Sequence, residues 1–202
     1  FFATGEHDSE QGRMLSGIFV GAVKDTVTAN VLAVEAAGLR PQIVDLNAFA
    51  IMRALSRGLH RSGVVAFVDI GARITNIIVA DNGSPRLVRT LASGGDDLTD
   101  AIASAMQMPL GEAERLKRQH GLQAAQLSPE ASGALNETAR RQVDAVRNTL
   151  SFYSQKHAGR PCEALVLSGG GSQLGGFGQY IASATRLRTS LADPFETLQR
   201  GK

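Results

Sequence analysis

The sequence is poor in residues that build disulfide frameworks and cysteine-based metal clusters. It contains one cysteine, Cys162, and no tryptophan, and aromatic residues make up 5% of its 202 positions. A single cysteine excludes a disulfide framework and fits a reducing compartment. The four histidines are scattered along the chain and do not have the spacing of zinc ligands.

Long apolar runs and an excess of one charge are also missing. The longest uncharged apolar runs, residues 16–23 and 63–68, are far shorter than the ~20 residues of a membrane-spanning helix. A net charge of +2 gives no electrostatic footprint for nucleic acid. No signal peptide is visible, and because the chain begins Phe-Phe-Ala rather than with Met, we expect a fragment of a longer protein.

What is present is enough for a folded core. Hydrophobic residues make up 43% and charged residues 20% of the chain, which excludes disorder. The region before residue 60 predicts a loop over residues 1–12, a β-leaning run over 14–24, and a short strand at 43–44. Helices are predicted from Asp25 or Thr26 to Gly38, and from a capping Asn47 to the residue before Gly58.

The region after residue 60 has the clearest pattern. Strands are predicted over residues 64–68, 76–80 and 86–90, with Asn82-Gly83 as a strong hairpin signal. Helices follow from Asp96 or Asp97, over 111–120 and over 129–157, then a strand at 164–167, a helix ending near 184 and a strand at 187–191. The predicted order from residue 64 is therefore βββαααβαβ.

The segment Asp69-Ile-Gly71-Ala-Arg-Ile-Thr75 lies on a predicted strand–turn–strand. A turn that gathers backbone N–H groups can hold phosphate oxygens, and glycine lets the ligand approach the main chain closely. A carboxylate at the end of the strand would hold a hydrated Mg²⁺. The alternative is a glycine hairpin with an aspartate side-chain turn and no ligand.

The segment Ser168-Gly-Gly-Gly-Ser172 lies between a predicted strand and a predicted helix. Backbone amides at such a helix start can bind an anion or pack against a planar ring. The segment is neither a P-loop, which needs G-x-x-x-x-G-K-[ST], nor a nucleophile elbow. A tight strand-to-helix connection without a ligand is the alternative.

Three further segments carry polar residues whose individual explanation is structural. Glu114 and Lys117 share a helix face with Arg118 beside them, and a solvated charged face is the simpler interpretation. Gly94-Gly95-Asp96 is typical of a strand-to-helix cap, and Asp45 of a capping residue.

Taken in order along the chain, these segments resemble the second half of the actin-like ATPase superfamily, which includes actin, the heat-shock chaperone ATPases and FtsA. The similarity is greater to the PilM family, the cytoplasmic actin-like proteins of type IV pilus assembly. It extends roughly over residues 14–195, and its motifs lie at residues 44–50, 68–77, 91–95, 112–117 and 166–177.

The resemblance implies an α/β, ribonuclease-H-like fold of the actin-like ATPase type, with a mixed sheet that starts βββα. It also implies two parts. Residues 1–59 would be the end of the first actin-like half with its inserted subdomain, and residues 60–202 would be the second, nucleotide-binding half.

The resemblance further implies a site for ATP and Mg²⁺. Asp69 would hold the hydration shell of the metal, and Asp45 would orient an attacking water. The positions that match the family's nucleotide contacts are Gly71 and Thr75 at the β- and γ-phosphates, Gly95 near the sugar and phosphates, Glu114 and Lys117 at the ribose, Arg118 on the adenine face, and Gly170, Gly171 and Ser172 around the adenosine. Asp193 would be a late adenine-side contact.

One departure from the family is large, because its first phosphate loop has no counterpart here. Positioning and electrostatics dominate phosphoryl transfer, so we expect hydrolysis to be lost in this chain alone even if some nucleotide binding remains. The implied role is a scaffold at the cytoplasmic face of the inner membrane that holds the short cytoplasmic tail of PilN, with nucleotide controlling domain closure.

Two alternatives stay open. A nucleotide-independent interaction or filament-forming module of the same fold is favoured by Arg73 and Ile74, which replace small residues in the phosphate loop. A sugar kinase of the same fold is disfavoured because no sugar-binding carboxylate cluster stands out.

Overall fold

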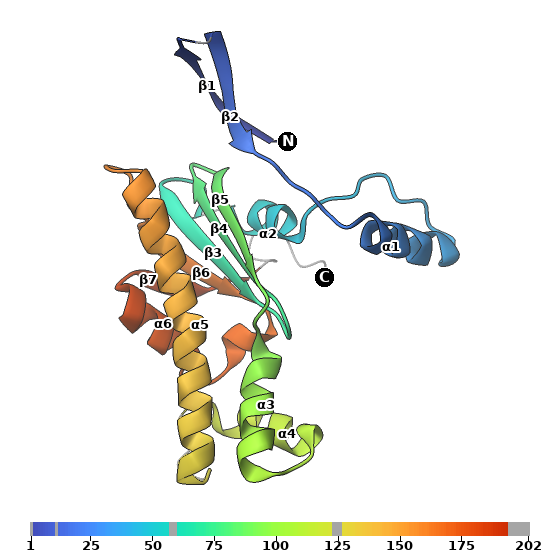
Figure 1. Cartoon of the computed structure of the whole chain (residues 1–202), viewed down its shortest axis with the longest axis vertical. Coiled ribbons are helices and arrows are strands. Elements are labelled where there is room, and N and C mark those ends of the chain that lie inside the picture. Colours follow the sequence, from blue (N-terminus) through green and yellow to red (C-terminus); the bar gives the residue numbers. More distant parts are fainter. Residues whose placement is uncertain (1, 11, 57–59, 123–126, 194–202) are drawn as a thin grey trace, which may run out of the picture.

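The structure is a computed structural model, and it describes residues 2–10, 12–56, 60–122 and 127–193. Its main body is a five-stranded sheet with helices on both faces. A hairpin and one helix from the N-terminal part of the chain project from this body (Figure 1).

The sheet has the order β5 (Ser84–Leu91), β4 (Thr75–Asp81), β3 (Val64–Ile70), β6 (Ala164–Ser168) and β7 (Arg188–Leu191). The first three form an antiparallel meander, whereas β6 pairs with β3, and β7 with β6, in parallel. Asn82 and Gly83 connect β4 to β5 with φ angles of 50° and 76°, as a tight hairpin turn requires. The predicted mixed sheet and its hairpin are confirmed.

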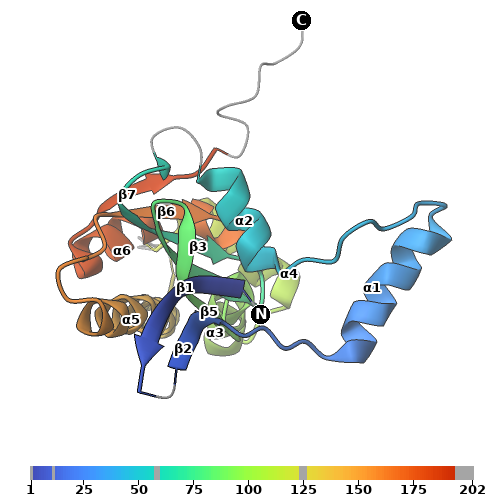
Figure 2. The same cartoon turned by 90° about the horizontal axis from the view of Figure 1, so that it is seen from above.

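Two apolar clusters cover the two faces of the sheet. On one face, Val64, Ala66 and Val68 pack with α3 (Gly95–Met106), α5 (Pro129–Lys156) and α6 (Phe177–Thr185). On the opposite face, Val65 and Phe67 pack against α2 (Asn47–Leu55), which Figure 2 shows across the sheet from α5. Alternate residues of β3 point to opposite faces, so a strand covered on both sides is apolar throughout.

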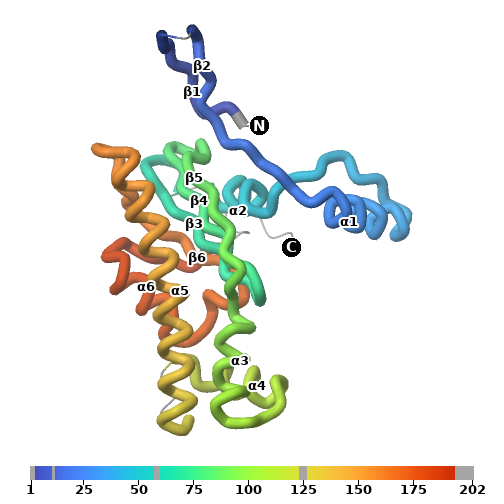
Figure 3. Tube along the Cα trace, viewed as in Figure 1, coloured from blue at the N-terminus to red at the C-terminus, as the bar shows by residue number. Residues whose placement is uncertain are grey.

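The helices also follow the sequence pattern. The predicted stripe of α5 is buried at all five positions, namely Leu135, Val143, Val146, Leu150 and Tyr153. Beyond the end of the sheet, α4 (Leu110–His120) lies beside α3 (Figure 3). A short 3₁₀ helix, η2 (Gly170–Gln173), follows β6. The predicted order of helices and strands from residue 64 is confirmed.

The prediction for residues 1–12 was wrong. They contribute β1 (Phe2–Ser9), which pairs antiparallel with β2 (Gly12–Ile18). Most side chains of this hairpin are exposed, so its sequence lacks the apolar alternation that identifies a half-buried strand. Arg86 Nη1 on β5 donates a hydrogen bond to the Thr4 carbonyl at 3.0 Å and so links the hairpin to the sheet.

The following helix is confirmed, but the predicted strand at residues 43–44 is not. The helix α1 (Lys24–Ala36) has no buried residue. Ile43 and Val44 are 84% and 61% exposed, and no described strand lies beside them to form a ladder. Leu46 occupies the N-cap position of α2, and the predicted cap Asn47 is its first helical residue.

Among the described residues, no helix is both long enough and apolar enough to cross a membrane.

Candidate functional site

Four segments that are far apart in the sequence enclose one cavity beside the carboxyl ends of β3 and β6. It has a volume of about 440 Å³ and is bordered by the turn after β3, the start of α3, one face of α4, and η2. Seven of the residues predicted to bind nucleotide line it, and these are Gly71, Gly95, Glu114, Lys117, Arg118, Gly170 and Gly171. The crevice outside the carboxyl ends of strands is where open α/β sheets bind ligands.

The turn after β3 and the start of α3 are in direct backbone contact. Gly95 N donates to Gly71 O at 2.9 Å, and Asp96 N donates to Ala72 O at 2.7 Å. A Cβ atom on Gly94 would lie 2.4 Å from the Ala72 carbonyl oxygen. Only glycine therefore allows the helix to begin against this turn.

The glycine segment after β6 serves both packing and the cavity. A Cβ on Gly171 would lie 2.5 Å from Ile70 Cγ2, whereas a Cβ on Gly170 would meet no atom within 4 Å. Gly171 is thus required by packing, and Gly170 leaves open space at the cavity wall. The segment after β6 therefore forms a tight strand-to-helix connection and also borders a cavity large enough for a ligand.

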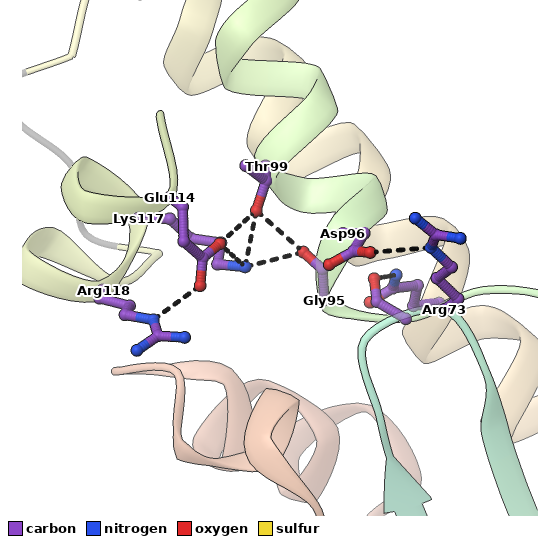
Figure 4. A network of polar contacts seen from close by, with 9 residues as sticks. Arg73, Gly95, Asp96, Thr99, Glu114, Lys117 and Arg118 are labelled. Carbon is purple, nitrogen blue, oxygen red and sulfur yellow. Dashed lines mark hydrogen bonds and ion pairs between the residues drawn. The ribbon is translucent and has the colours of Figure 1, made fainter. Parts of the chain in front are cut away.

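A polar network joins α4 to the start of α3 (Figure 4). Lys117 is 8% exposed, and its Nζ lies 2.8 Å from Gly95 O, 2.8 Å from Thr99 Oγ1 and 2.6 Å from Glu114 Oε2. All three ammonium N–H groups have a partner. The interpretation as a solvated charged face is therefore wrong for Lys117.

Glu114 is held ionised by its neighbours. Partial burial opposes its charge, but hydrogen bonds with Lys117, Thr99 and Arg118 outweigh that effect and lower the pKa of Glu114 to about 2. Arg118 Nε donates to Glu114 Oε1 at 2.6 Å, and the Arg118 side chain is 78% exposed. The α4 wall thus combines a satisfied buried cation with an exposed guanidinium.

Three other predicted residues do not line this cavity. Thr75 Oγ1 donates to Ser93 O at 2.8 Å, and Ser172 Oγ donates to Gly169 O at 2.7 Å. Asp69 Oδ1 accepts a hydrogen bond from Ser168 Oγ at 2.9 Å. The bonds of Thr75 and Asp69 join separate segments, and the bond of Ser172 lies within its own loop. The predicted ligand contacts of the three residues stay predictions.

The two remaining predicted aspartates are not brought to the cavity wall. Asp45 precedes α2 and forms an ion pair with Arg53. Asp193 is the last described residue. Their roles also stay predictions.

The sequence did not reveal a support behind the Gly94–Gly95 turn. Gln142, a buried residue of α5, donates through Nε2 to Gly94 O at 2.7 Å, and Asp97 Oδ2 accepts from Gly94 N at 3.1 Å. Asp97 is three residues from the turn, which is the spacing of a helix cap and could have been recognised. Gln142 lies on the buried face of α5, seven residues after Leu135 and four before Val146, so a polar residue within the apolar stripe was the available signal.

Among the described residues, no group of three or more His, Cys, Asp and Glu side chains is placed to hold a metal ion. A Mg²⁺ ion bound with a nucleotide retains several waters and uses few protein ligands. Asp69, at the carboxyl end of β3, has the chemistry to bind such a hydrated ion, so the residues present fit a water-mediated site.

Comparison with known proteins supports the same architecture. The family model described as Type IV pilus assembly protein PilM matches residues 4–202. The solved PilM-PilN type IV pilus biogenesis complex matches with a TM-score of 0.70 and 27% identity, covering 86% of this chain and 49% of that chain.

More distant proteins share the fold. MreB5 of Spiroplasma citri bound to AMPPNP matches with a TM-score of 0.66 at 15% identity, over 85% of this chain and 61% of that one. The cell division protein FtsA of Bacillus subtilis (strain 168) is 36% identical over 98 residues, 48% of this chain and 22% of FtsA. The chain thus spans about half the length of the PilM chain, and its fold is actin-like, as predicted.

Proposed function

Since this chain belongs to the family of the type IV pilus assembly protein PilM, we propose that it forms the nucleotide-binding half of an actin-like pilus-assembly scaffold. The observation that supports this proposal is one cavity lined by seven of the residues that the resemblance assigns to the nucleotide, from four separate segments. The structural likeness to an AMPPNP-bound MreB5 supports a nucleotide as the ligand.

The proposed binding mode assigns each wall of the cavity a part of the nucleotide. The turn at Gly71 and the start of α3 at Gly95 receive the phosphates, and Gly170, Gly171 and Ser172 surround the adenosine. Arg118 covers the adenine face. A ribose hydroxyl that accepts from Lys117 must replace one of its present partners, because the Lys117 ammonium is fully bonded, whereas a hydroxyl can donate to Glu114 without displacing one.

Mg²⁺ is proposed to accompany the nucleotide, held by Asp69 through water. A bound Mg²⁺ ion neutralises phosphate charge. We propose binding rather than turnover for this chain alone, because it lacks a counterpart of the first phosphate loop. Nucleotide would then control closure of two halves, and Asp45 would contribute to hydrolysis only in a closed protein.

Residues 1–59 are proposed to belong to the first actin-like half and its inserted subdomain, and residues 60–202 to the second half. The partner proposed is the N-terminal tail of PilN, since the matched PilM structure is a complex with PilN. Such a scaffold would lie at the cytoplasmic face of the inner membrane and reach the membrane through its partners.

Titration calorimetry tests nucleotide binding. We expect the complete gene product to bind Mg·ATP and the 202-residue chain to bind it weakly. Tight, Mg²⁺-dependent binding by the isolated chain would show that the first phosphate loop is unnecessary. Absence of ATP binding by the complete product would contradict the proposal.

Fluorescence anisotropy with a labelled PilN N-terminal peptide tests the partner. A short extended peptide needs backbone partners and side-chain pockets, which the N-terminal residues of this chain supply incompletely. We expect much weaker binding to the 202-residue chain than to the complete gene product. Comparable affinities would place the partner site on residues 64–202.

The second candidate is a nucleotide-independent interaction or filament-forming module. It is favoured by one observation, namely that Glu114 and Lys117 form an ion pair with each other and need no ligand to neutralise their charges. Peptide binding or assembly that is unaffected by ATP would select this alternative.

A further inference from the structure

The turn between β3 and β4 carries a cation next to the cavity. Arg73 follows Ala72, which lines the cavity, and its Nε donates to Asp96 Oδ2 at 3.2 Å. Asp96 also lines the cavity, from the first turn of α3. Figure 4 shows this ion pair at one end of the polar network and Arg118 at the other. Arg118 lines the cavity, and Arg73 lies next to it through its neighbour Ala72 and its partner Asp96.

Lys117 and the two guanidiniums differ in how many of their N–H donors are already used in hydrogen bonds. Lys117 uses all its donors on Gly95, Thr99 and Glu114. Arg118 is bonded to Glu114 on the α4 side. The Arg73 side chain is 87% exposed, and its contact with Asp96 is made through Nε.

This contact is easily exchanged. Exposed ion pairs add little to stability, so Arg73 can leave Asp96 at small cost. A guanidinium has five donors arranged as a fork, which matches two oxygens of a phosphate group. Asp96 has the opposite effect, since a carboxylate on the cavity wall repels a nearby phosphate unless a cation neutralises it.

We infer that Arg73 is a phosphate-binding residue of this site, which leaves Asp96 for a terminal phosphate of the bound nucleotide. Asp96 competes with the phosphate for Arg73 and sets how strongly the site prefers a charged nucleotide over a nucleoside. The inference rests on the proposed function and adds to it a residue that the resemblance did not assign. Arg73 stands where the family has a small residue, and under this inference it contacts the nucleotide instead of disfavouring its binding.

The test is calorimetric titration of ATP and of adenosine, with Mg²⁺ present, into the complete gene product and its variants. Arg73→Ala is expected to weaken ATP binding about tenfold, the loss of one charge-assisted hydrogen bond, and to leave adenosine binding unchanged. Arg73→Lys is expected to lie between, because a lysine keeps the charge without the fork. Asp96→Asn is expected to tighten ATP binding about threefold by removing the competitor.

Arg115→Ala, an exposed arginine of α4, is the control for the change in net charge. Unchanged ATP binding by Arg73→Ala overturns the inference. Equal weakening of ATP and adenosine overturns it as well, because that result indicates a structural role in the turn. An unmodified protein that binds neither ligand contradicts the proposed function itself, whereas ATP binding that ignores Arg73 contradicts this inference alone.

Discussion

The N-terminal segment, residues 2–45, and the sheet with its helices α2–α6 bury their apolar side chains very differently. Nine of the thirteen exposed large hydrophobic residues among those described lie between residues 14 and 44. The sheet, in contrast, has two continuous apolar clusters and buries β3 and β4 almost completely.

The stability of the two regions therefore depends on different contacts. The sheet supplies its own core, so its stability follows from the described residues. The N-terminal segment forms a hairpin and a helix without burying their apolar side chains. For residues 2–45 this agrees with the proposal that they belong to another part of an actin-like protein, whereas α2, which the same proposal includes, packs against the sheet.

The largest expected effect separates the two regions directly. Phe67→Ala should destabilise the chain by about 3–5 kcal/mol, because Phe67 is fully buried between the sheet and α2. Phe19→Ala, at a position 83% exposed, should change the unfolding free energy by less than about 0.5 kcal/mol. Urea denaturation of both variants measures the difference, and similar losses would show that the N-terminal segment shares the core.

A smaller loss of stability is expected at Gly94, beside the cavity, where it tests whether the site is part of the packed structure of the sheet and its helices. Gly94→Ala should cost about 1–3 kcal/mol, because its Cβ would overlap the Ala72 carbonyl. Gly170→Ala is the matched control, since its Cβ has open space. Thermal unfolding compares the two, and equal melting temperatures would contradict the close packing of α3 on the turn.

The pH dependence of stability tests the charge network. The pKa of Glu114 is lowered from 4.5 to about 2, so its ionised form stabilises the folded state above pH 4.5, and this contribution is lost as the pH falls toward 2. Because the Glu114 side chain is 32% exposed, solvent screens its interactions, and we expect its ionised form to contribute about 1 kcal/mol to the free energy of unfolding. The difference in unfolding free energy between the unmodified chain and Glu114→Gln, measured by urea denaturation, should become smaller as the pH falls over this range.

Glu112→Gln, an exposed position on the same helix, is the control for that series. A difference between the unmodified chain and Glu114→Gln that stays constant from pH 6 to pH 2 would contradict the network.

The smallest expected effect concerns the link between the two regions. Arg86→Ala removes the hydrogen bond to Thr4 together with a 4.0 Å ion pair to Asp81 at the end of β4, and should cost about 0.5–1 kcal/mol. Amide hydrogen exchange should become faster in β1 and β2 and stay unchanged in β3 and β4. Faster exchange throughout the sheet would show that the hairpin stabilises it.

Elements with local signals could be predicted from the amino-acid sequence. The stripe of α5 and the Asn82-Gly83 hairpin were predicted correctly, because helix periodicity and turn chemistry act over a few residues. The strand β1 was missed because it is exposed and shows no alternation, whereas the β-leaning run predicted over residues 14–24 overlaps β2. The strand predicted at residues 43–44 failed for the opposite reason, since β propensity cannot form a ladder without a neighbouring strand.

The candidate site was only partly open to the same reasoning. Its motifs were recognised as segments, but their meeting around one cavity depends on the pairing of β3 with β6 and on the packing of α4 against α3. The burial of Lys117, the support from Gln142 and the ion pair of Arg73 with Asp96 were decided by tertiary structure alone. Each joins residues at least 18 positions apart, and such contacts arise only when the chain folds.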